Sequence, residues 1–120
     1  MKEYYENGKI KFEGEYLNGK RNGKGKAYYN DSKTKFEGEY LNGKRHGKGK
    51  EYYEDGELEF EGEYLNGEKN GKGKEYFFKY RTLKFEGEYL NGKRHGFGKE
   101  YNYVGQLIYE GNYINGERNE

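Results

Sequence analysis

The chain of 120 residues contains no cysteine, which excludes a disulfide framework and any chemistry that needs a thiolate. The absence of cysteine is typical of a reducing compartment, so we expect a cytoplasmic protein. No run of residues approaches the roughly 20 apolar residues of a membrane span, and the first residues lack the apolar stretch of a signal peptide. At most, the sequence predicts a protein peripheral to a membrane.

The chain also has almost no net charge and few hydrophobic residues. The 23 Lys and Arg residues against 22 Asp and Glu residues leave a formal charge of +1, so there is no general attraction for nucleic acid, and nucleic acid is not expected as a partner. Hydrophobic residues make up 30% of the chain and charged residues 38%. A conventional two-layer core is therefore not expected.

Aromatic residues are abundant in the chain, although hydrophobic residues as a whole are few. Its 16 Tyr and 7 Phe supply most of the surface that folding can bury, although tryptophan is absent and there is one methionine. A Tyr or Phe ring covers a large area and loses little rotamer entropy. The composition therefore predicts a thin protein held together by a stripe of aromatic rings.

One phrase recurs along the whole chain. Phe12-Glu-Gly-Glu-Tyr-Leu-Asn-Gly returns from Phe36, Phe60 and Phe85, and a variant opens at Tyr109, with spacings of 24, 24, 25 and 24 residues. A period of this length indicates a solenoid, in which each unit buries its face against its neighbours. We expect a single domain over 1–120, divided into a half-repeat 1–11, repeats 12–35, 36–59, 60–84 and 85–108, and a half-repeat 109–120.

Each repeat is expected to form two short strands. Apolar residues alternate with period two around the glycines, which are too frequent for a helix. Asp55-Gly56 predicts a two-residue type I′ turn, which pairs Tyr53 with Leu58 and Gly49 with Gly62. The result is an all-β protein of successive hairpins in an elongated sheet.

The second connection of each repeat is expected to be longer. A six-residue loop from Asn18 to Gly23 pairs Tyr16 with Gly25 and Phe12 with Tyr29, so that rings lie over glycines on the inward face. Glutamates and lysines fill the outward face, where we expect modest cross-strand ion pairs.

Four glutamates do not fit this register. Glu51 falls on the inward parity beside the rings, as do its counterparts Glu3, Glu75 and Glu100, and Ala27 takes their place in the first full repeat. Either a bulge shifts these strands or the carboxylates line a wet concave surface.

The segment from Phe36 to Lys50, with Asp55-Gly56 downstream, resembles the MORN repeat (membrane occupation and recognition nexus), close to its bacterial variant. The resemblance spans essentially the whole chain. It implies a single-layer, twisted, antiparallel sheet of about ten strands that serves in protein interaction, dimerisation or assembly, with phospholipid binding as a debated role. Bacterial relatives are often described as antitoxins.

We expect a non-catalytic scaffold that binds a protein partner or assembles with itself. Terminal tyrosines are expected to mediate a homodimer or an end-to-end oligomer, because both ends of the sheet are half-repeats with unpaired edges. These are Tyr4, Tyr5, Tyr109 and Tyr113. The expected partner-binding residues are the rings of the aromatic face, namely Phe12, Tyr16, Tyr29, Phe36, Tyr40, Tyr53, Phe60, Tyr64, Phe85 and Tyr89.

An alternative is the binding of anionic lipid or another polyanion along a basic edge of stacked loops. The expected anion-binding residues are Lys20, Arg21, Lys44, Arg45, Lys69, Lys93 and Arg94. Neutralisation of the strand lysines by neighbouring glutamates is the competing interpretation. The irregular segments 77–82 and 102–105 could encode a specific partner contact or simply be variation in tolerant loops.

No catalytic or metal-binding residues and no cofactor are expected. His46 and His95 lie two repeats apart, roughly 20 Å across four strands, and cannot share a metal ion. Ser32 is the only serine and has no candidate base nearby in the pattern. Paired carboxylates are present in every repeat, which is typical of a solvated face and marks no pair for glycoside cleavage. Non-catalytic carbohydrate binding along tyrosines remains an alternative.

Overall fold

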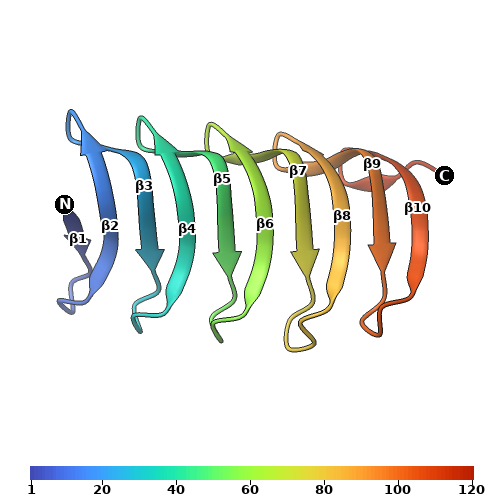
Figure 1. The fold of residues 1–120 in the computed structure, drawn as a ribbon, viewed down its shortest axis with the longest axis horizontal. Helices are drawn as coiled ribbons and strands as arrows, with labels where there is room; N and C mark the ends of the chain where they lie inside the picture. Colours follow the sequence, from blue (N-terminus) through green and yellow to red (C-terminus); the bar gives the residue numbers. More distant parts are fainter.

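The computed structural model describes all 120 residues as one antiparallel sheet of eleven strands, arranged in the order of the chain. Figure 1 shows the strands side by side from the N-terminus to the C-terminus. The particle measures 47 × 29 × 18 Å. The expected all-β, single-layer, elongated sheet is confirmed. No helix is long and apolar enough to cross a bilayer. The strands are β1 (Lys2–Tyr4), β2 (Ile10–Leu17), β3 (Lys20–Tyr28), β4 (Thr34–Leu41), β5 (Lys44–Tyr52), β6 (Leu58–Leu65), β7 (Glu68–Tyr76), β8 (Leu83–Leu90), β9 (Lys93–Tyr101), β10 (Leu107–Ile114) and β11 (Glu117–Arg118).

The tight turns follow the even-numbered strands, at Asn-Gly. Asn18 and Gly19 have φ angles of 52° and 77°, both in the left-handed region that a type I′ turn requires. Leu17 therefore pairs with Lys20 and Tyr16 with Arg21. The predicted six-residue loop was wrong, and so were its pairs Tyr16 with Gly25 and Phe12 with Tyr29.

The loops after the odd-numbered strands were also assigned wrongly. At Asp55-Gly56 only the glycine has a positive φ, 93°, and the Tyr53 N–H donates to the carbonyl of Glu57 at 2.8 Å. Three residues therefore form the loop, and a register shift pairs Tyr52, in place of Tyr53, with Leu58. The Gly49–Gly62 pair was predicted correctly, because the shift lies between that pair and the loop.

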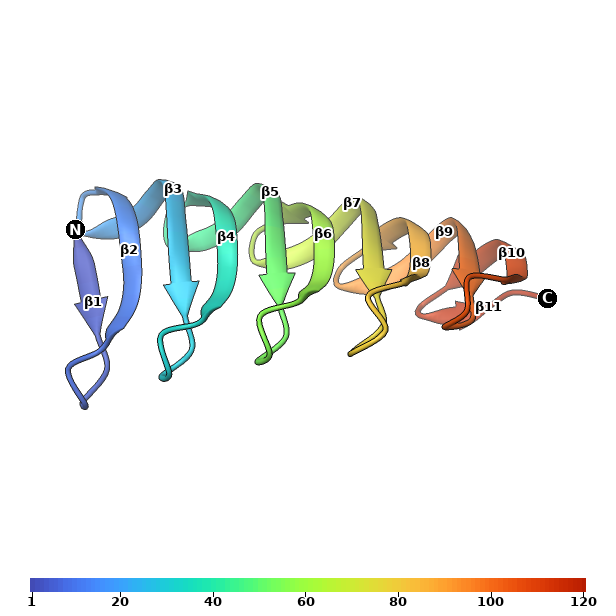
Figure 2. The same cartoon turned by 60° about the horizontal axis from the view of Figure 1, so that its bottom comes forward.

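A second irregularity bends each hairpin near its Asn-Gly turn. Between Gly14 and Tyr16 the register of β2 and β3 shifts by two residues, and Gly23 takes a φ of 104°. The Glu15 carboxylate accepts a hydrogen bond from the backbone N–H of Lys24 at 2.7 Å and so holds the bulge. Figure 2 shows the strands curving over at this end, which gives the sheet its bent cross-section.

Aromatic rings on one face of the sheet form the core. Phe12, Phe36, Phe60 and Phe85 have no exposed surface, and each ring packs edge-on against a tyrosine of its own repeat and of the next. The ring centroids lie 5.1–5.8 Å apart, within the range of favourable T-shaped contacts. A continuous ladder of rings therefore replaces the second layer that most domains use.

The glycines under this ladder let the rings and the adjacent strand approach the backbone closely, as expected. A Cβ atom at Gly49 would lie 2.5 Å from the Phe36 ring, and one at Gly38 would lie 2.6 Å from the Lys48 carbonyl. Neither position has a positive φ, so the requirement is for space.

Candidate functional site

The glutamates that did not fit the predicted register belong to a polar cluster beside the rings. Glu51, on β5, accepts a hydrogen bond from the Tyr64 hydroxyl on β6, and Glu75, on β7, accepts one from Tyr89 on β8. The inward parity was therefore right, and the carboxylates join one hairpin to the next. We call each such group of a glutamate, a tyrosine and a neighbouring basic residue a latch.

The latch around Glu75 shows its full geometry. The Arg94 guanidinium donates two hydrogen bonds to the carboxylate, from Nε at 3.1 Å and from Nη2 at 3.0 Å. Burial opposes ionisation of Glu75, but the hydrogen bonds from Arg94 and Tyr89 outweigh it and lower the pKa of the carboxyl. Glu3 with Arg21, and Glu100 with Arg118, form the same two-pronged pairs.

A basic side chain also covers each of the four buried Phe rings. The Arg21, Arg45 and Arg94 guanidinium carbons lie 4.0–4.1 Å from the centroids of Phe12, Phe36 and Phe85, and Lys69 Nζ lies 4.2 Å from that of Phe60. At this distance a cation over the ring face is attracted by the aromatic quadrupole. The cations therefore close the aromatic core from the side that has no second sheet.

This arrangement places most of the expected partner-binding rings in the interior. Seven of the ten are buried, and Tyr16, Tyr29 and Tyr53 are partly buried. Tyr29 and Tyr53 donate to the backbone carbonyls of Tyr52 and Tyr76 in the next repeat, both at 2.6 Å. These side chains hold successive hairpins together, so the surfaces open to a partner lie elsewhere.

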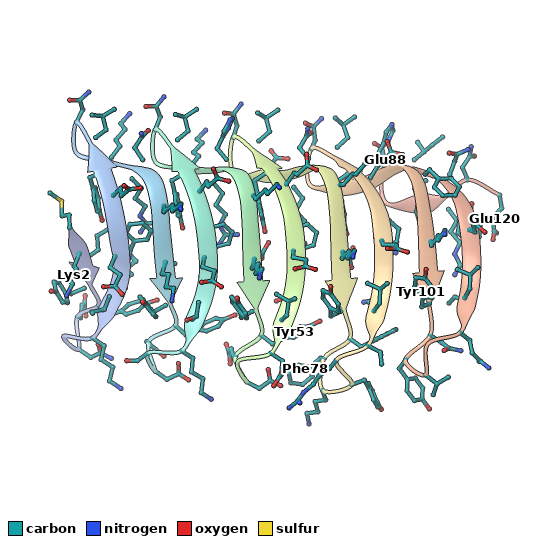
Figure 3. All side chains as sticks on the ribbon, viewed as in Figure 1. Lys2, Tyr53, Phe78, Glu88, Tyr101 and Glu120 are labelled. Atoms are coloured by element: carbon teal, nitrogen blue, oxygen red, sulfur yellow. The ribbon has the colours of Figure 1, made fainter.

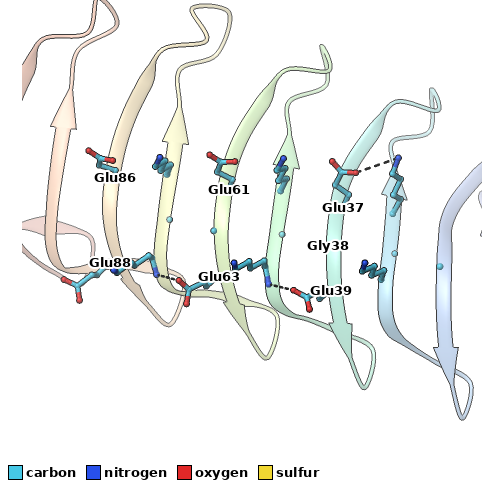
Figure 4. A pocket seen from close by; sticks show the side chains of 18 of the residues that line it. Glu37, Gly38, Glu39, Glu61, Glu63, Glu86 and Glu88 are labelled. Atoms are coloured by element: carbon cyan, nitrogen blue, oxygen red, sulfur yellow. Dashed lines mark hydrogen bonds and ion pairs between the residues drawn. The ribbon is translucent and has the colours of Figure 1, made fainter.

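The opposite face of the sheet carries a long groove of 1290 Å³. Its floor is the backbone at pairs of glycines, such as Gly38 and Gly49, and Figure 4 shows acidic and basic side chains in two rows along it. Within each row the charge alternates from strand to strand, except that the second row ends in the uncharged Phe97. One row holds Glu13, Lys26, Glu37, Lys50, Glu61, Lys74, Glu86 and Lys99, and the other holds Lys24, Glu39, Lys48, Glu63, Lys72, Glu88 and Phe97.

The two rows of this Gly-Lys-Glu groove are fixed differently. In the first row, Glu13 and Glu61 accept hydrogen bonds from the Tyr28 and Tyr76 hydroxyls, at 2.5 and 2.7 Å. In the second row, Glu39 accepts the backbone N–H of Lys48 at 2.9 Å. The carboxylates are thus held in place, while lysines such as Lys48 and Lys50 stay exposed.

The expected anion-binding residues do not form one stripe. Arg21, Arg45, Lys69 and Arg94 turn toward the aromatic core, as described above. Lys20, Lys44 and Lys93 lie exposed beside the Asn-Gly turns, where Glu68 takes the equivalent place in the third full repeat.

The four terminal tyrosines differ in exposure. Tyr4 is exposed, whereas the Tyr5 hydroxyl donates to the Tyr28 carbonyl at 2.5 Å. Tyr113 is buried and donates to Glu100, also at 2.5 Å, and Tyr109 packs edge-on against it at 5.5 Å. Tyr4 and parts of Tyr5 and Tyr109 are therefore open to another molecule.

The irregular loop 77–82 projects from the edge of the sheet. Phe78 packs against Tyr53 at 5.0 Å, as Figure 3 shows, and Tyr80 stacks on Tyr103 of the next loop at 4.5 Å. Arg81 forms an ion pair with Glu57 at 2.9 Å. Three neighbouring loops are thus linked, and Phe78, Tyr80 and Tyr103 remain about half exposed.

The histidines lie beside the Asn-Gly turns. His95 Nδ1 accepts the backbone N–H of Asn115 at 3.3 Å, and His46 Nδ1 is buried without a partner. No group of three His, Cys, Asp or Glu side chains is placed to hold a metal ion.

Family comparisons agree with this geometry. The MORN repeat model matches residues 12–34, 36–57, 60–79, 85–106 and 109–119, and the model of the MORN repeat variant matches residues 1–18. The chain belongs to the MORN repeat family. No curated protein matches this MORN repeat chain.

Sequence reasoning missed the latches and the groove for one reason. The Glu-Tyr spacing of 13 residues was visible at Glu3 and Tyr16, Glu51 and Tyr64, and Glu100 and Tyr113. A constant spacing between a carboxylate and a hydroxyl in successive repeats was the available signal. It indicates a hydrogen bond only when the strands are paired in the correct register.

Proposed function

We propose that this MORN repeat chain is a non-catalytic scaffold that binds an extended segment of a protein partner in the Gly-Lys-Glu groove. The groove itself supports this proposal. It runs across the strands from Met1 and Lys2 to Lys99, and its floor carries no side chains. A partner backbone can therefore approach the sheet closely.

The width of the groove favours an extended chain over a helix. Its two rows stand on residues two apart in a strand, as Glu37 and Glu39 do on either side of Gly38, which separates them by roughly 7 Å. One extended chain fits such a spacing, whereas a helix with its side chains is about 10–12 Å wide. The alternating charges along both rows offer salt bridges to acidic and basic side chains of the partner.

Charge reversal in the groove is the experiment that tests this function. The double variant Lys50→Glu/Lys74→Glu changes two exposed side chains of one row. Proteins captured by the immobilised chain are purified, and their Kd values are measured by calorimetry. We expect the variant to raise Kd at least about tenfold, since interface charges of the wrong sign repel as well as fail to attract.

A matched control reverses two lysines outside the groove, Lys20→Glu/Lys93→Glu, and should leave those Kd values unchanged. The groove variant and the control variant also test the lipid alternative, by co-sedimentation with vesicles of phosphatidylserine in phosphatidylcholine. If the groove variant and the parent chain bound the captured proteins equally well, the groove would not be the binding site. Loss of vesicle sedimentation in the control variant alone would favour lipid binding at the turns.

Self-assembly is a second candidate, favoured by the free edge of β10. β11 pairs with β10 only at Tyr113 and Ile114, and the Asn119 N–H donates to the Asn112 carbonyl at 2.9 Å, so the outer edge of β10 is unpaired from Leu107 to Gly111. Leu107 and Ile108 are about half exposed there. An unpaired edge with apolar side chains is a template for pairing with another strand.

For this candidate, the particle mass of residues 1–120 should rise with concentration in light scattering, with an elongated shape in small-angle scattering. Ile108→Lys should keep the chain monomeric, because an edge lysine opposes strand pairing. Val104→Lys, in the adjacent loop, is the control. A constant monomer mass for the parent chain would rule out assembly through this edge.

A further inference from the structure

We infer that a binding pocket for a carboxylate group lies between the first and second full repeats, at the place where Ala27 interrupts the row of latch glutamates. Ala27 pairs with Phe36 as Glu51 pairs with Phe60 and Glu100 with Tyr109. The backbone of this repeat is therefore the same as in the others. Only the carboxylate is missing.

The two donors that would bind this carboxylate are present. Tyr40 stands 13 residues after Ala27, as Tyr64 does after Glu51, and Arg45 stands 18 residues after it, as Arg21 does after Glu3. The Tyr40 side chain is 5% exposed, and its hydroxyl is buried without any hydrogen-bond partner. It is the only tyrosine hydroxyl left buried and unpaired.

The Arg45 guanidinium likewise lacks the hydrogen bonds that the other latch arginines make. The other latch arginines each donate two hydrogen bonds to a glutamate, whereas the nearest carboxylate to Arg45 is that of Glu51, with Nη1 and Oε2 3.6 Å apart. Glu51 already accepts a hydrogen bond from Tyr64. The fork of Arg45 is thus open to a planar, two-oxygen acceptor.

A cavity of 310 Å³ lies at this place. It is lined by Ala27, by the rings of Tyr5, Tyr28 and Tyr40, and by the turn glycines Gly43 and Gly67. The other lining residues are five cations, with no carboxylate among them: Lys11, Arg21, Lys35, Lys44 and Arg45. Arg21 is occupied by Glu3, and Lys11, Lys35 and Lys44 are exposed. The pocket is therefore positively charged and open to a ligand from outside.

The chemistry of the donors selects a carboxylate. Burial raises the pKa of Tyr40, so its hydroxyl keeps its proton and can donate. A donor buried without a partner costs free energy that an incoming acceptor recovers. The complete latches show how a carboxylate sits between one hydroxyl and one guanidinium, and a ligand carboxylate would take the same position between the first two full repeats.

Titration of the ¹⁵N-labelled chain with sodium acetate, against sodium chloride at equal ionic strength, tests this pocket by NMR. We expect saturable shifts at the Ala27 and Tyr40 amides and at Arg45 Nε–H, with a millimolar Kd. Tyr40→Phe, which removes the unpaired hydroxyl, should weaken acetate binding about fivefold. Ala27→Glu should abolish it and raise Tm, because the new side chain completes the latch.

The outcomes that overturn the proposal are specific. Shifts that grow linearly and equally with acetate and chloride would show that the pocket binds no carboxylate. The same would follow from an unchanged Kd for acetate in Ala27→Glu. Tighter binding of inorganic phosphate than of acetate, measured at a pH where phosphate is monoanionic, would assign the pocket to a different anion.

A peptide pair distinguishes the source of the carboxylate. Blocked Gly-Gly-Glu-Gly-Gly and Gly-Gly-Gln-Gly-Gly are titrated under the same conditions. Tighter binding of the glutamate peptide than of acetate supports an acidic side chain of a polypeptide as the ligand, and equal binding supports a free small carboxylate. Equal affinity of the two peptides would contradict the need for a carboxylate.

Discussion

Replacing Phe60 by alanine is expected to lower the free energy of unfolding by about 3–5 kcal/mol. Phe60 is fully buried, contacts Tyr64 and Tyr89 edge-on at 5.8 and 5.3 Å, and is covered by Lys69. The lost ring leaves a cavity that neighbours on a single-layer sheet cannot fill from above. A destabilisation of this size is a large share of the roughly 5–15 kcal/mol that holds a typical domain together.

Urea unfolding followed by circular dichroism measures this effect. Leu65→Ala is the matched control, because Leu65 lies in the same hairpin but is 46% exposed, and its truncation should cost less than about 1 kcal/mol. If the two variants lost the same stability, the aromatic ladder would not be the core.

Replacing Gly62 by alanine is expected to destabilise the chain by about 3 kcal/mol, at the upper end of the usual cost of overpacking. The added Cβ would lie 2.6 Å from the Lys72 carbonyl oxygen and 2.7 Å from the Gly73 Cα, and both are backbone atoms of the adjacent strand. The Phe60 ring would also lie 2.8 Å away. No side-chain rotation relieves the backbone contacts, so the strands must separate.

Gly111→Ala provides the comparison at the equivalent place in β10. There the three atoms nearest to the new Cβ all belong to the Tyr109 side chain, with its hydroxyl at 2.7 Å, and no strand lies on the outer side of Gly111. Because a side-chain terminus can move, we expect a loss of no more than about 1 kcal/mol by thermal unfolding. An equal loss for both variants would mean that the close backbone approach is not what excludes a side chain at Gly62.

The repeat, the strand content and the ring-over-glycine packing could all be predicted from the sequence. They follow from a period of 24 or 25 residues and from alternation around glycine, both of which are properties of neighbours in the chain. The Gly49–Gly62 pairing was predicted for the same reason, since it lies on the regular part of the hairpin.

The turns were predicted less well because two candidate dipeptides compete in every repeat. Both Asn18-Gly19 and Asp55-Gly56 are typical of tight turns, but only the asparagine takes a positive φ. In the other loop, the Asp55 side chain accepts the Glu57 N–H at 3.0 Å, which stabilises a three-residue loop. Sequence alone does not say which of the two dipeptides the strands prefer.

The candidate site was the least predictable part. The role of Glu51 depends on Tyr64 in the next repeat, and the vacancy beside Tyr40 depends on Ala27, 13 residues earlier. Such contacts pass from one hairpin to the next and appear only when the stacking of strands is known. The rings were expected to meet a partner because a single-layer sheet has no second layer to bury them. The sequence did not show that arginine and glutamate side chains cover these rings.

The latches also allow one hairpin to be exchanged for another in the array. Each latch that is complete joins one hairpin to the next with the same side chains, so a hairpin copied or lost during evolution meets neighbours that still fit it. A duplication of 24 residues adds two strands and lengthens the sheet by about 10 Å. The number of repeats thus sets the length of the array.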